Sequence, residues 1–138
     1  MSNRAEEKLQ AEIVTWHKNE CRQGILWAND NNAVSPQQMM AKRAKGFRKG
    51  ASDLNFILND IFYAIELKIY GTSHNRIHLL EQIEFGREIE KQDGMFLFCF
   101  SLCEFKQISL GDLIIVKNDT EYWIKKIEES NNQQFKFL

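Results

Sequence analysis

The chain has 138 residues, of which 43% are hydrophobic, 12% aromatic and 27% charged. This composition excludes a disordered chain and predicts a single domain with a core of its own. No apolar run approaches the roughly 18–20 residues that a membrane-spanning helix needs. The polar N-terminus predicts no secretory signal, and three cysteines are too few for a disulfide scaffold, so we expect a cytoplasmic protein in a reducing compartment.

The formal net charge is −1, from 18 basic and 19 acidic residues, which by itself does not indicate a nucleic-acid binder. Five basic residues nevertheless fall within eight positions that contain no acidic residue: Lys42, Arg43, Lys45, Arg48 and Lys49. Such a run is usually a solvated surface, and it is also what a phosphate backbone attracts. We therefore treat it as a candidate nucleic-acid-binding surface.

The first part of the chain predicts a helix followed by a short strand. Residues 4–22 predict the helix, because apolar side chains recur at helical spacing along one side: Leu9, Ile13 and Trp16. Gly24 follows where a helix would end. Residues 25–28 then predict a strand, and the polar run 29–32 predicts a turn.

A second helix and a hairpin come next. Ser35 and Pro36 are typical of a helix start, with Ser as the cap and Pro at the first helical position, and this helix would end near Gly46. Residues 53–58 and 61–68 predict two strands. They are joined by a two-residue turn at 59–60, although this turn lacks the preferred Gly in second place.

The rest of the chain completes an α/β pattern. Residues 75–92 predict a helix, and 95–100 form a continuous apolar run that is typical of a buried strand. A capping box at Ser101 predicts a further short helix, and residues 113–127 predict a final hairpin. The strand–helix–strand order predicts a parallel crossover and hence a mixed central sheet flanked by helices.

The hairpin register places two acidic residues together. If 59–60 form the turn, Asp53 lies opposite Glu66, and opposed side chains share a sheet face with Cβ atoms about 4.5–5.5 Å apart. Lys68 projects from the same face, two residues further on. The other face is apolar, and we predict that it faces the core: Leu54, Phe56, Leu58, Ile61, Tyr63, Ile65 and Leu67.

Two opposed carboxylates destabilise a hairpin, whereas a hard divalent cation would turn their repulsion into coordination. An adjacent Lys could offset phosphate charge and orient or deprotonate a metal-bound water. The alternative is that Glu66 and Lys68 face solvent and that Asp53 caps a loop. A bare Glu-x-Lys triplet favours that alternative, but the full pattern, with Gly-x-x-Asp before the hairpin, favours a metal site.

Other candidate sites are weaker. His74 and His78 have the spacing of a helical metal pair, but no Glu stands in the arrangement of a zinc protease. Cys99 and Cys103 have no second pair, so we expect them to be small core residues. His17 is expected at the edge of the core.

Two short motifs resemble the PD-(D/E)XK nuclease core: Gly50-Ala51-Ser52-Asp53, and Ala64-Ile65-Glu66-Leu67-Lys68 followed by Gln82. Within that superfamily they are most similar to the VRR-NUC group, which includes small stand-alone phage and bacterial members. The opening helix matches at Glu6, Leu9, Gln10, Ile13 and Trp16, and the basic run matches in placement. The resemblance covers about residues 4–105 of one domain spanning 1–138, and leaves about 110–138 as a C-terminal extension. It implies a restriction-endonuclease-like core in the order αβββαβ.

The resemblance also implies a role for each matching residue. Asp53 and Glu66 would be metal ligands together with the backbone carbonyl of Leu67, and Lys68 would position the attacking water and stabilise developing charge. Glu6 would reach the metal directly or through water, with Glu7 as the competing choice.

Gln82 would lean over the site from the crossover helix and hold Lys68 or the water. The chain departs from the family pattern in two places. Ser52 stands where proline is usual, and the spacing from Lys68 to Gln82 is longer than usual and lacks the typical Ser-Pro.

The implied function is a Mg²⁺-dependent endonuclease, with Mn²⁺ as a substitute, that hydrolyses DNA phosphodiester bonds. Small stand-alone relatives are similar to junction-resolving homodimers, so branched DNA or four-way junctions are the expected substrates. The alternatives are a non-catalytic nucleic-acid- or protein-binding module on a nuclease-like fold, which would need a broken site, and a small subunit with no nucleic-acid role.

Overall fold

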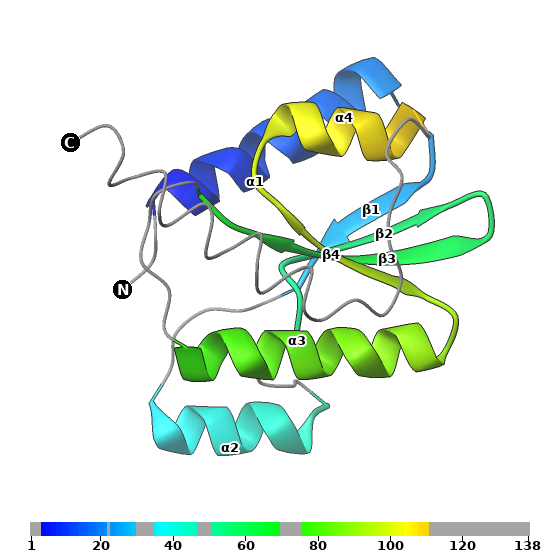
Figure 1. The fold of residues 1–138 in the computed structure, drawn as a ribbon. Coiled ribbons are helices and arrows are strands. Elements are labelled where there is room, and N and C mark those ends of the chain that lie inside the picture. The colour runs from blue at the N-terminus through cyan, green and yellow to red at the C-terminus, as the bar shows by residue number, and fades with distance from the viewer. Residues whose placement is uncertain (1–3, 22, 30–34, 47–50, 70–75, 111–138) are drawn as a thin grey trace.

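The structure, a computed structural model, describes residues 4–21, 23–29, 35–46, 51–69 and 76–110 (Figure 1). In chain order the elements are α1 (Arg4–Trp16), the π-helical turn η1 (His17–Cys21), β1 (Ile25–Ala28), α2 (Pro36–Ala44), β2 (Leu54–Leu58), β3 (Ile61–Leu67), α3 (Arg76–Lys91), β4 (Met95–Cys99) and α4 (Leu102–Leu110). The chain is therefore an α/β protein, as predicted. The predicted hairpin at 113–127 lies outside the described residues, as do Arg48, Lys49 and His74.

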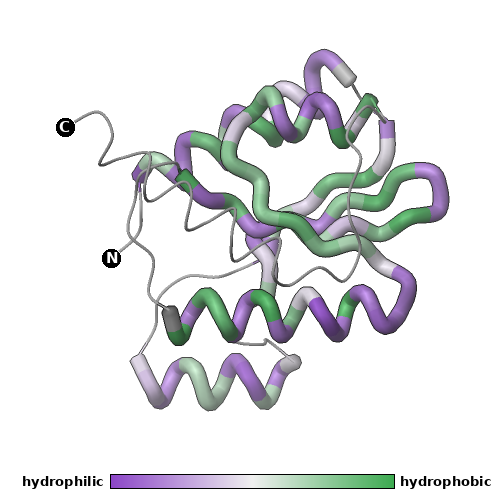
Figure 2. Tube along the Cα trace, viewed as in Figure 1, coloured by the Kyte–Doolittle hydropathy of each residue, from purple (hydrophilic) through white to green (hydrophobic). Residues whose placement is uncertain are grey.

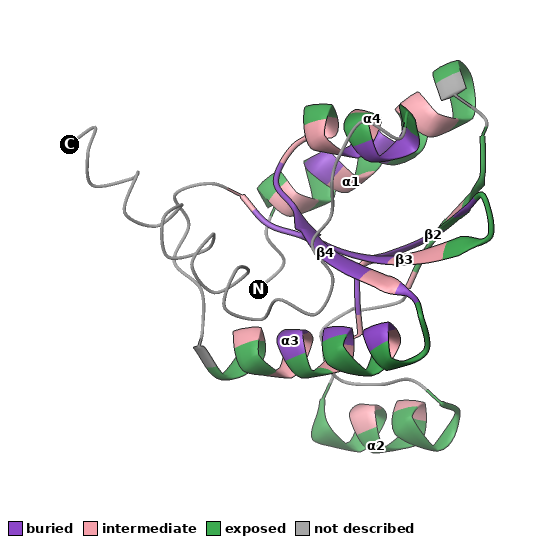
Figure 3. Cartoon of the chain, turned by 45° about the vertical axis from the view of Figure 1, so that its right-hand side comes forward, coloured by how far each residue is buried: buried purple, intermediate pink, exposed green. Residues whose placement is uncertain are grey.

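A four-stranded mixed sheet forms the centre, in the order β1-β2-β3-β4. The pairs β1–β2 and β2–β3 are antiparallel, and β3–β4 is parallel across the crossover through α3. Helices α1 and α4 cover one face of the sheet and α3 covers the other (Figure 1). Helix α2 lies on the far side of α3 from the sheet in both views (Figures 1 and 3).

The β2–β3 hairpin has the predicted turn and register. Asn59 and Asp60 both adopt positive φ angles, 50° and 67°, as a type I′ turn requires. Asn and Asp tolerate this conformation better than other non-glycine residues, which explains a turn without Gly. Leu54 and Ile65 form the last pair of the ladder at the end away from the turn.

The apolar face of the hairpin packs under α1 and α4, as predicted for most of its members. Phe56 is fully buried against Phe105 of α4, with ring centroids 5.3 Å apart. Two predicted core residues differ: Ile61 is 38% exposed and Tyr63 is half-buried. Ile61 directly follows the turn, and the turn end of the hairpin projects beyond the helices (Figure 1).

The opposite face of the sheet is covered as well. Helix α3 packs so closely on β4 that a Cβ built on Gly86 would lie 2.4 Å from the ring of Phe96. Strands β3 and β4 are thus buried on both sides, and Figure 3 shows them enclosed between helices. Figure 2 shows the strands as largely hydrophobic and the hairpin tip as hydrophilic. Polar residues of β3 near the middle of the sheet therefore cannot simply face solvent.

The predicted first helix does not remain α-helical to residue 22, because its last turn is the π-helical η1. The chain then reverses at Gly24, which has φ of 75°. A Cβ at this position would lie 2.5 Å from the carbonyl oxygen of Ile57 and 2.8 Å from the ring of Phe56. Only glycine fits there, and the reversal brings β1 against β2.

Local caps define the two short helices. Ser35 caps α2 as predicted and forms a capping box with Gln38, whose backbone N–H donates to Ser35 Oγ at 3.2 Å. At α4, Glu104 N–H donates to Ser101 Oγ at 3.2 Å, and the Glu104 carboxylate accepts from Phe100 N–H. No described residue of α2 is buried, so caps rather than core packing define this helix. None of the described helices is long and apolar enough to cross a membrane.

Candidate active site

Asp53 stands directly before β2, one register position beyond the last ladder pair, and faces the end of β3. The backbone N–H of Leu67 donates to Asp53 Oδ2 at 2.8 Å. This hydrogen bond turns the carboxylate of Asp53 across the hairpin toward Glu66, the residue that the register places opposite. The two acidic residues thus meet where β2 begins and β3 ends.

Glu66 is only 5% exposed. Burial raises the pKa of its carboxyl group well above the usual 4.5, and the nearby charge of Asp53 raises it further, while Lys68 acts in the opposite direction. Glu66 can share a hydrogen bond with Asp53 only when a proton lies between the two carboxyl groups. Among the described residues, Glu66 Oε2 has no hydrogen-bond donor. An ionised Glu66 therefore carries a buried oxygen that a cation would satisfy.

Lys68 lies beside the carboxylates and is only 7% exposed. Its backbone N–H donates to Cys99 O at 3.0 Å, which continues the β3–β4 ladder. Its ammonium lies 5.7 Å from the centre of the Phe98 ring, within the range of a cation–π contact. The positive charge of this ammonium opposes the rise in pKa that burial causes at both Glu66 and Glu6.

Helix α1 turns Glu6 toward this site and leaves Glu7 exposed. Glu6 is half-buried, and burial raises its pKa; Lys68 lowers this pKa and Asp53 raises it. The geometry thus favours Glu6 over Glu7. Within the described ranges, however, no three Asp, Glu, His or Cys side chains are grouped closely enough to hold a metal ion by themselves. Glu6 therefore does not complete a cage with Asp53 and Glu66, and a water could bridge it to a bound ion.

Gln82 reaches the site from α3, although its spacing from Lys68 is unusual for the family pattern. Its Nε2 donates to Glu66 Oε1 at 2.9 Å, a partner that the sequence prediction did not name. Its Oε1 is buried and has no hydrogen-bond donor among the described residues. Two buried acceptor oxygens, one from Glu66 and one from Gln82, thus lack a donor in the same part of the molecule.

Two residues of this region were not predicted from the sequence: Asn29 and Asn55. Asn29 follows β1 and donates through Nδ2 to Ser52 O at 2.6 Å. Asn55, in β2, is 7% exposed and donates to Asn29 Oδ1 at 2.7 Å. An asparagine inside an otherwise apolar strand is unfavourable in a sheet, and this is the signal that could have identified it.

The basic run is on a different element from the carboxylates. Lys42 and Arg43 lie in the last turn of α2, and Lys45 is its C-cap. Arg43 and Lys45 are exposed, and Lys42 is half-buried. Basic side chains at a helix C-terminus are favoured by the helix dipole, which gives these residues a local reason to be there besides any ligand.

The donor set fits Mg²⁺ or Mn²⁺ better than zinc. The two opposed side chains are carboxylates, and the adjacent backbone of Leu67 can add a carbonyl, so every ligand from these residues would be an oxygen. The undonated Oε2 of buried Glu66 is one oxygen that such a cation could occupy. His78 is exposed on α3. Cys99 is buried, as expected, and its thiol donates to Ser101 O at 3.3 Å, whereas Cys103 is exposed on α4, so the expectation of a core residue is wrong there. His17 lies against Phe56 at the edge of the core, as expected.

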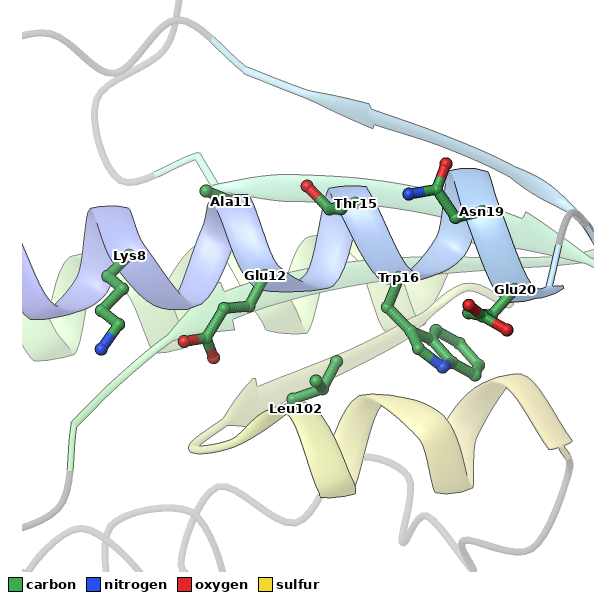
Figure 4. A pocket seen from close by; sticks show the side chains of 8 residues that line it. All are labelled: Lys8, Ala11, Glu12, Thr15, Trp16, Asn19, Glu20 and Leu102. Carbon is green, nitrogen blue, oxygen red and sulfur yellow. The ribbon is translucent and has the colours of Figure 1, made fainter.

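A separate groove runs along the outer side of α1, between that helix, η1 and α4 (Figure 4). It is lined by Lys8, Ala11, Glu12, Thr15, Trp16, Asn19, Glu20 and Leu102. None of the residues of the carboxylate site contributes to it. The candidate site is therefore defined by its clustered side chains rather than by this groove.

Comparisons with known proteins add no family assignment. No protein-family model matches the chain, and no curated protein matches its sequence.

Proposed function

We propose that this chain is a metal-dependent endonuclease that hydrolyses DNA phosphodiester bonds. The observation that carries the proposal is the pairing of Asp53 with buried Glu66, beside the buried ammonium of Lys68. Burying a glutamate and a lysine beside a half-buried aspartate costs stability, and such groups cluster where chemistry needs them. The resemblance of these residues to the VRR-NUC group of PD-(D/E)XK nucleases supports the same reading, with a restriction-endonuclease-like core.

In the proposed site, Asp53, Glu66 and the carbonyl of Leu67 would hold Mg²⁺, or Mn²⁺ in its place. A bound divalent cation supplies Lewis-acid stabilisation of the phosphoryl oxygens and lowers the pKa of bound water. Gln82 fixes one oxygen of Glu66 and leaves Oε2 for coordination. Leu67 N–H fixes Oδ2 of Asp53 in the same way.

Lys68 is the residue best placed to act on the reacting groups. Its ammonium can orient the attacking water and offset negative charge as a new P–O bond forms. The attacking water gives up one proton to solvent, the bond to the leaving oxygen breaks, and that oxygen takes up one proton from solvent. Glu6, facing Lys68 from α1, would hold a second water or the ion's outer ligands.

Phosphate contacts would come from the basic run Lys42, Arg43, Lys45, Arg48 and Lys49, which makes binding sensitive to salt. We further propose a homodimer acting on branched DNA, since a four-way junction has two symmetry-related cleavage points and a twofold dimer presents two sites. Sedimentation of the protein at micromolar concentration, with and without a junction, tests this part. A monomer under both conditions would contradict it.

The catalytic proposal is tested by a cleavage panel of duplex, single strand, flap and four-way junction, each with Mg²⁺, Mn²⁺ or EDTA. We expect metal-dependent cleavage, strongest on a branched substrate, and none in EDTA. Asp53→Asn should abolish cleavage. Asp60→Asn is the matched control, because it makes the same change at the exposed turn of the same hairpin. Binding of DNA without cleavage of any substrate would instead support a non-catalytic module.

A further inference from the structure

We propose that Asn29 and Asn55 form a positioning pair that fixes the backbone on both sides of Asp53 and thereby sets the affinity of the site for its divalent cation. The inference rests on the proposed function and adds two residues to that site. Neither side chain is proposed to touch the ion or the substrate.

Asn29 holds both peptide groups that flank Asp53. Its backbone N–H donates to Asp53 O at 2.9 Å, and its side-chain Nδ2 donates to Ser52 O at 2.6 Å. The first carbonyl belongs to the peptide that follows the Cα of Asp53, and the second to the peptide that precedes it. Because each peptide group is planar, fixing both groups restricts φ and ψ of Asp53.

Asn55 determines which way the amide of Asn29 points. A primary amide presents a donor on one side and an acceptor on the other. Ser52 O can only accept, so Nδ2 of Asn29 must face it, and Oδ1 faces the donor of Asn55 at 2.7 Å. Without Asn55, the two orientations of the Asn29 amide would no longer be distinguished by this contact.

The pair acts on the same residue that the hairpin holds from the other side. Leu67 N–H fixes the carboxylate of Asp53, while Asn29 fixes its backbone. Asp53 stands one position outside the regular ladders of β2. There the backbone N–H of Asn29 continues the β1–β2 pairing by one bond, and the side chain of Asn29 adds a second contact. A ligand held in place before the ion arrives loses less freedom on binding, which is the reason for expecting an effect on affinity.

The experiment measures the Mn²⁺ dissociation constant by titration calorimetry, well below the unfolding temperature of each variant, for the full chain. Asn29→Ala should weaken Mn²⁺ binding by about 10-fold or more, the usual cost of removing a group that orients a ligand. The Mg²⁺ concentration for half-maximal cleavage should rise by a similar factor, and excess Mg²⁺ should restore much of the rate. Asn19→Ala, at an exposed position of η1, is the matched control.

Asn55→Leu separates positioning from folding. Leucine has a similar size and suits a buried strand, so unfolding stability should be kept or increased while Mn²⁺ affinity falls. A purely structural role would lower stability and leave the affinity unchanged.

The inference is overturned if Asn29→Ala and Asn55→Leu bind Mn²⁺ as tightly as Asn19→Ala. If the parent protein fails to bind Mn²⁺, or if Asp53→Asn binds it as tightly as the parent, then the proposed function itself has failed.

Discussion

The backbone N–H of Leu67 donates to Oδ2 of Asp53 at 2.8 Å, so the residue after Glu66 holds the carboxylate that Glu66 opposes. One strand thus both supplies an acidic side chain and orients its partner. Because this bond holds Asp53 facing Glu66, Asp53 does not turn away, and the fold retains the repulsion between the two carboxylates.

Replacing Glu66 by Gln should stabilise the metal-free protein at neutral pH. Burial and Asp53 raise the pKa of Glu66, so ionising it costs the folded state. As pH rises above 4.5, the unfolded chain loses this proton first, and the free energy of unfolding falls until the folded group has ionised too. Urea denaturation in EDTA should show this decline in the parent and a smaller one in Glu66→Gln.

In a domain of this size, each 1 kcal/mol gained in the free energy of unfolding raises Tm by roughly 4 °C. The same variant should lose the rise in Tm that Mg²⁺ produces in the parent. Glu12→Gln, at an exposed position of α1, is the control. It should change neither the stability in EDTA nor the rise in Tm with Mg²⁺. A Glu66→Gln protein that is less stable than the parent in EDTA would show that Glu66 is not held at a cost.

Lys68→Met should lower the cleavage rate by at least about 100-fold, the lower end of what a positioned acid–base group contributes. Methionine keeps an unbranched apolar stem in the space beside Phe98, so the fold should persist. Single-turnover rates at saturating Mg²⁺ give the comparison, with exposed Lys91→Met as the control. Cleavage at the parental rate would show that Lys68 takes no part in the chemical step.

Removing Arg43 and Lys45 together should weaken DNA binding at every sequence and flatten its salt dependence. Each lost phosphate contact reduces the slope of log K against log[salt] by about 0.9, so the double Ala variant should lose up to about 1.8. Fluorescence anisotropy in EDTA between 50 and about 200 mM salt measures this slope. Lys8→Ala with Lys18→Ala, both at exposed positions on the α1–η1 side, is the matched pair. An unchanged slope of log K against log[salt] would show that DNA does not contact Arg43 and Lys45.

Gly86→Ala tests the close packing that brings α3, and with it Gln82, onto the sheet. The new methyl group would lie 2.4 Å from the Phe96 ring, and overpacking of this kind typically costs about 1–3 kcal/mol. Elsewhere in a helix the same change would stabilise. Urea denaturation should show the loss, whereas Glu88→Ala on the exposed side of α3 should not. Equal stability of both variants would mean that α3 can shift without cost.

The hairpin register could be predicted because a two-residue turn leaves no freedom in pairing: once Asn59 and Asp60 turn, Asp53 must lie opposite Glu66. The burial of Glu66 and Lys68 could not be predicted, because it depends on where α3 packs. That position is set by packing between side chains of α3 and the sheet, such as Gly86 against Phe96, which the apolar spacing of either segment alone does not specify.

The partner of Gln82 and the Asn29–Asn55 pair were missed for related reasons. The first depends on the placement of α3 on the sheet. The second joins residues 26 positions apart, and only Asn55 stands out locally, as a polar residue in an apolar strand. The π-helical end of α1 likewise has no signal in the apolar spacing of residues 4–22.

Anomalous diffraction from a crystal grown with Mn²⁺ tests most directly whether Asp53 and Glu66 hold one ion together. We predict a single strong peak with an oxygen of each carboxylate within about 2.3 Å, and a third contact from the carbonyl of Leu67. A peak bound by only one of the two carboxylates, or none between them at millimolar Mn²⁺, would contradict the proposed site.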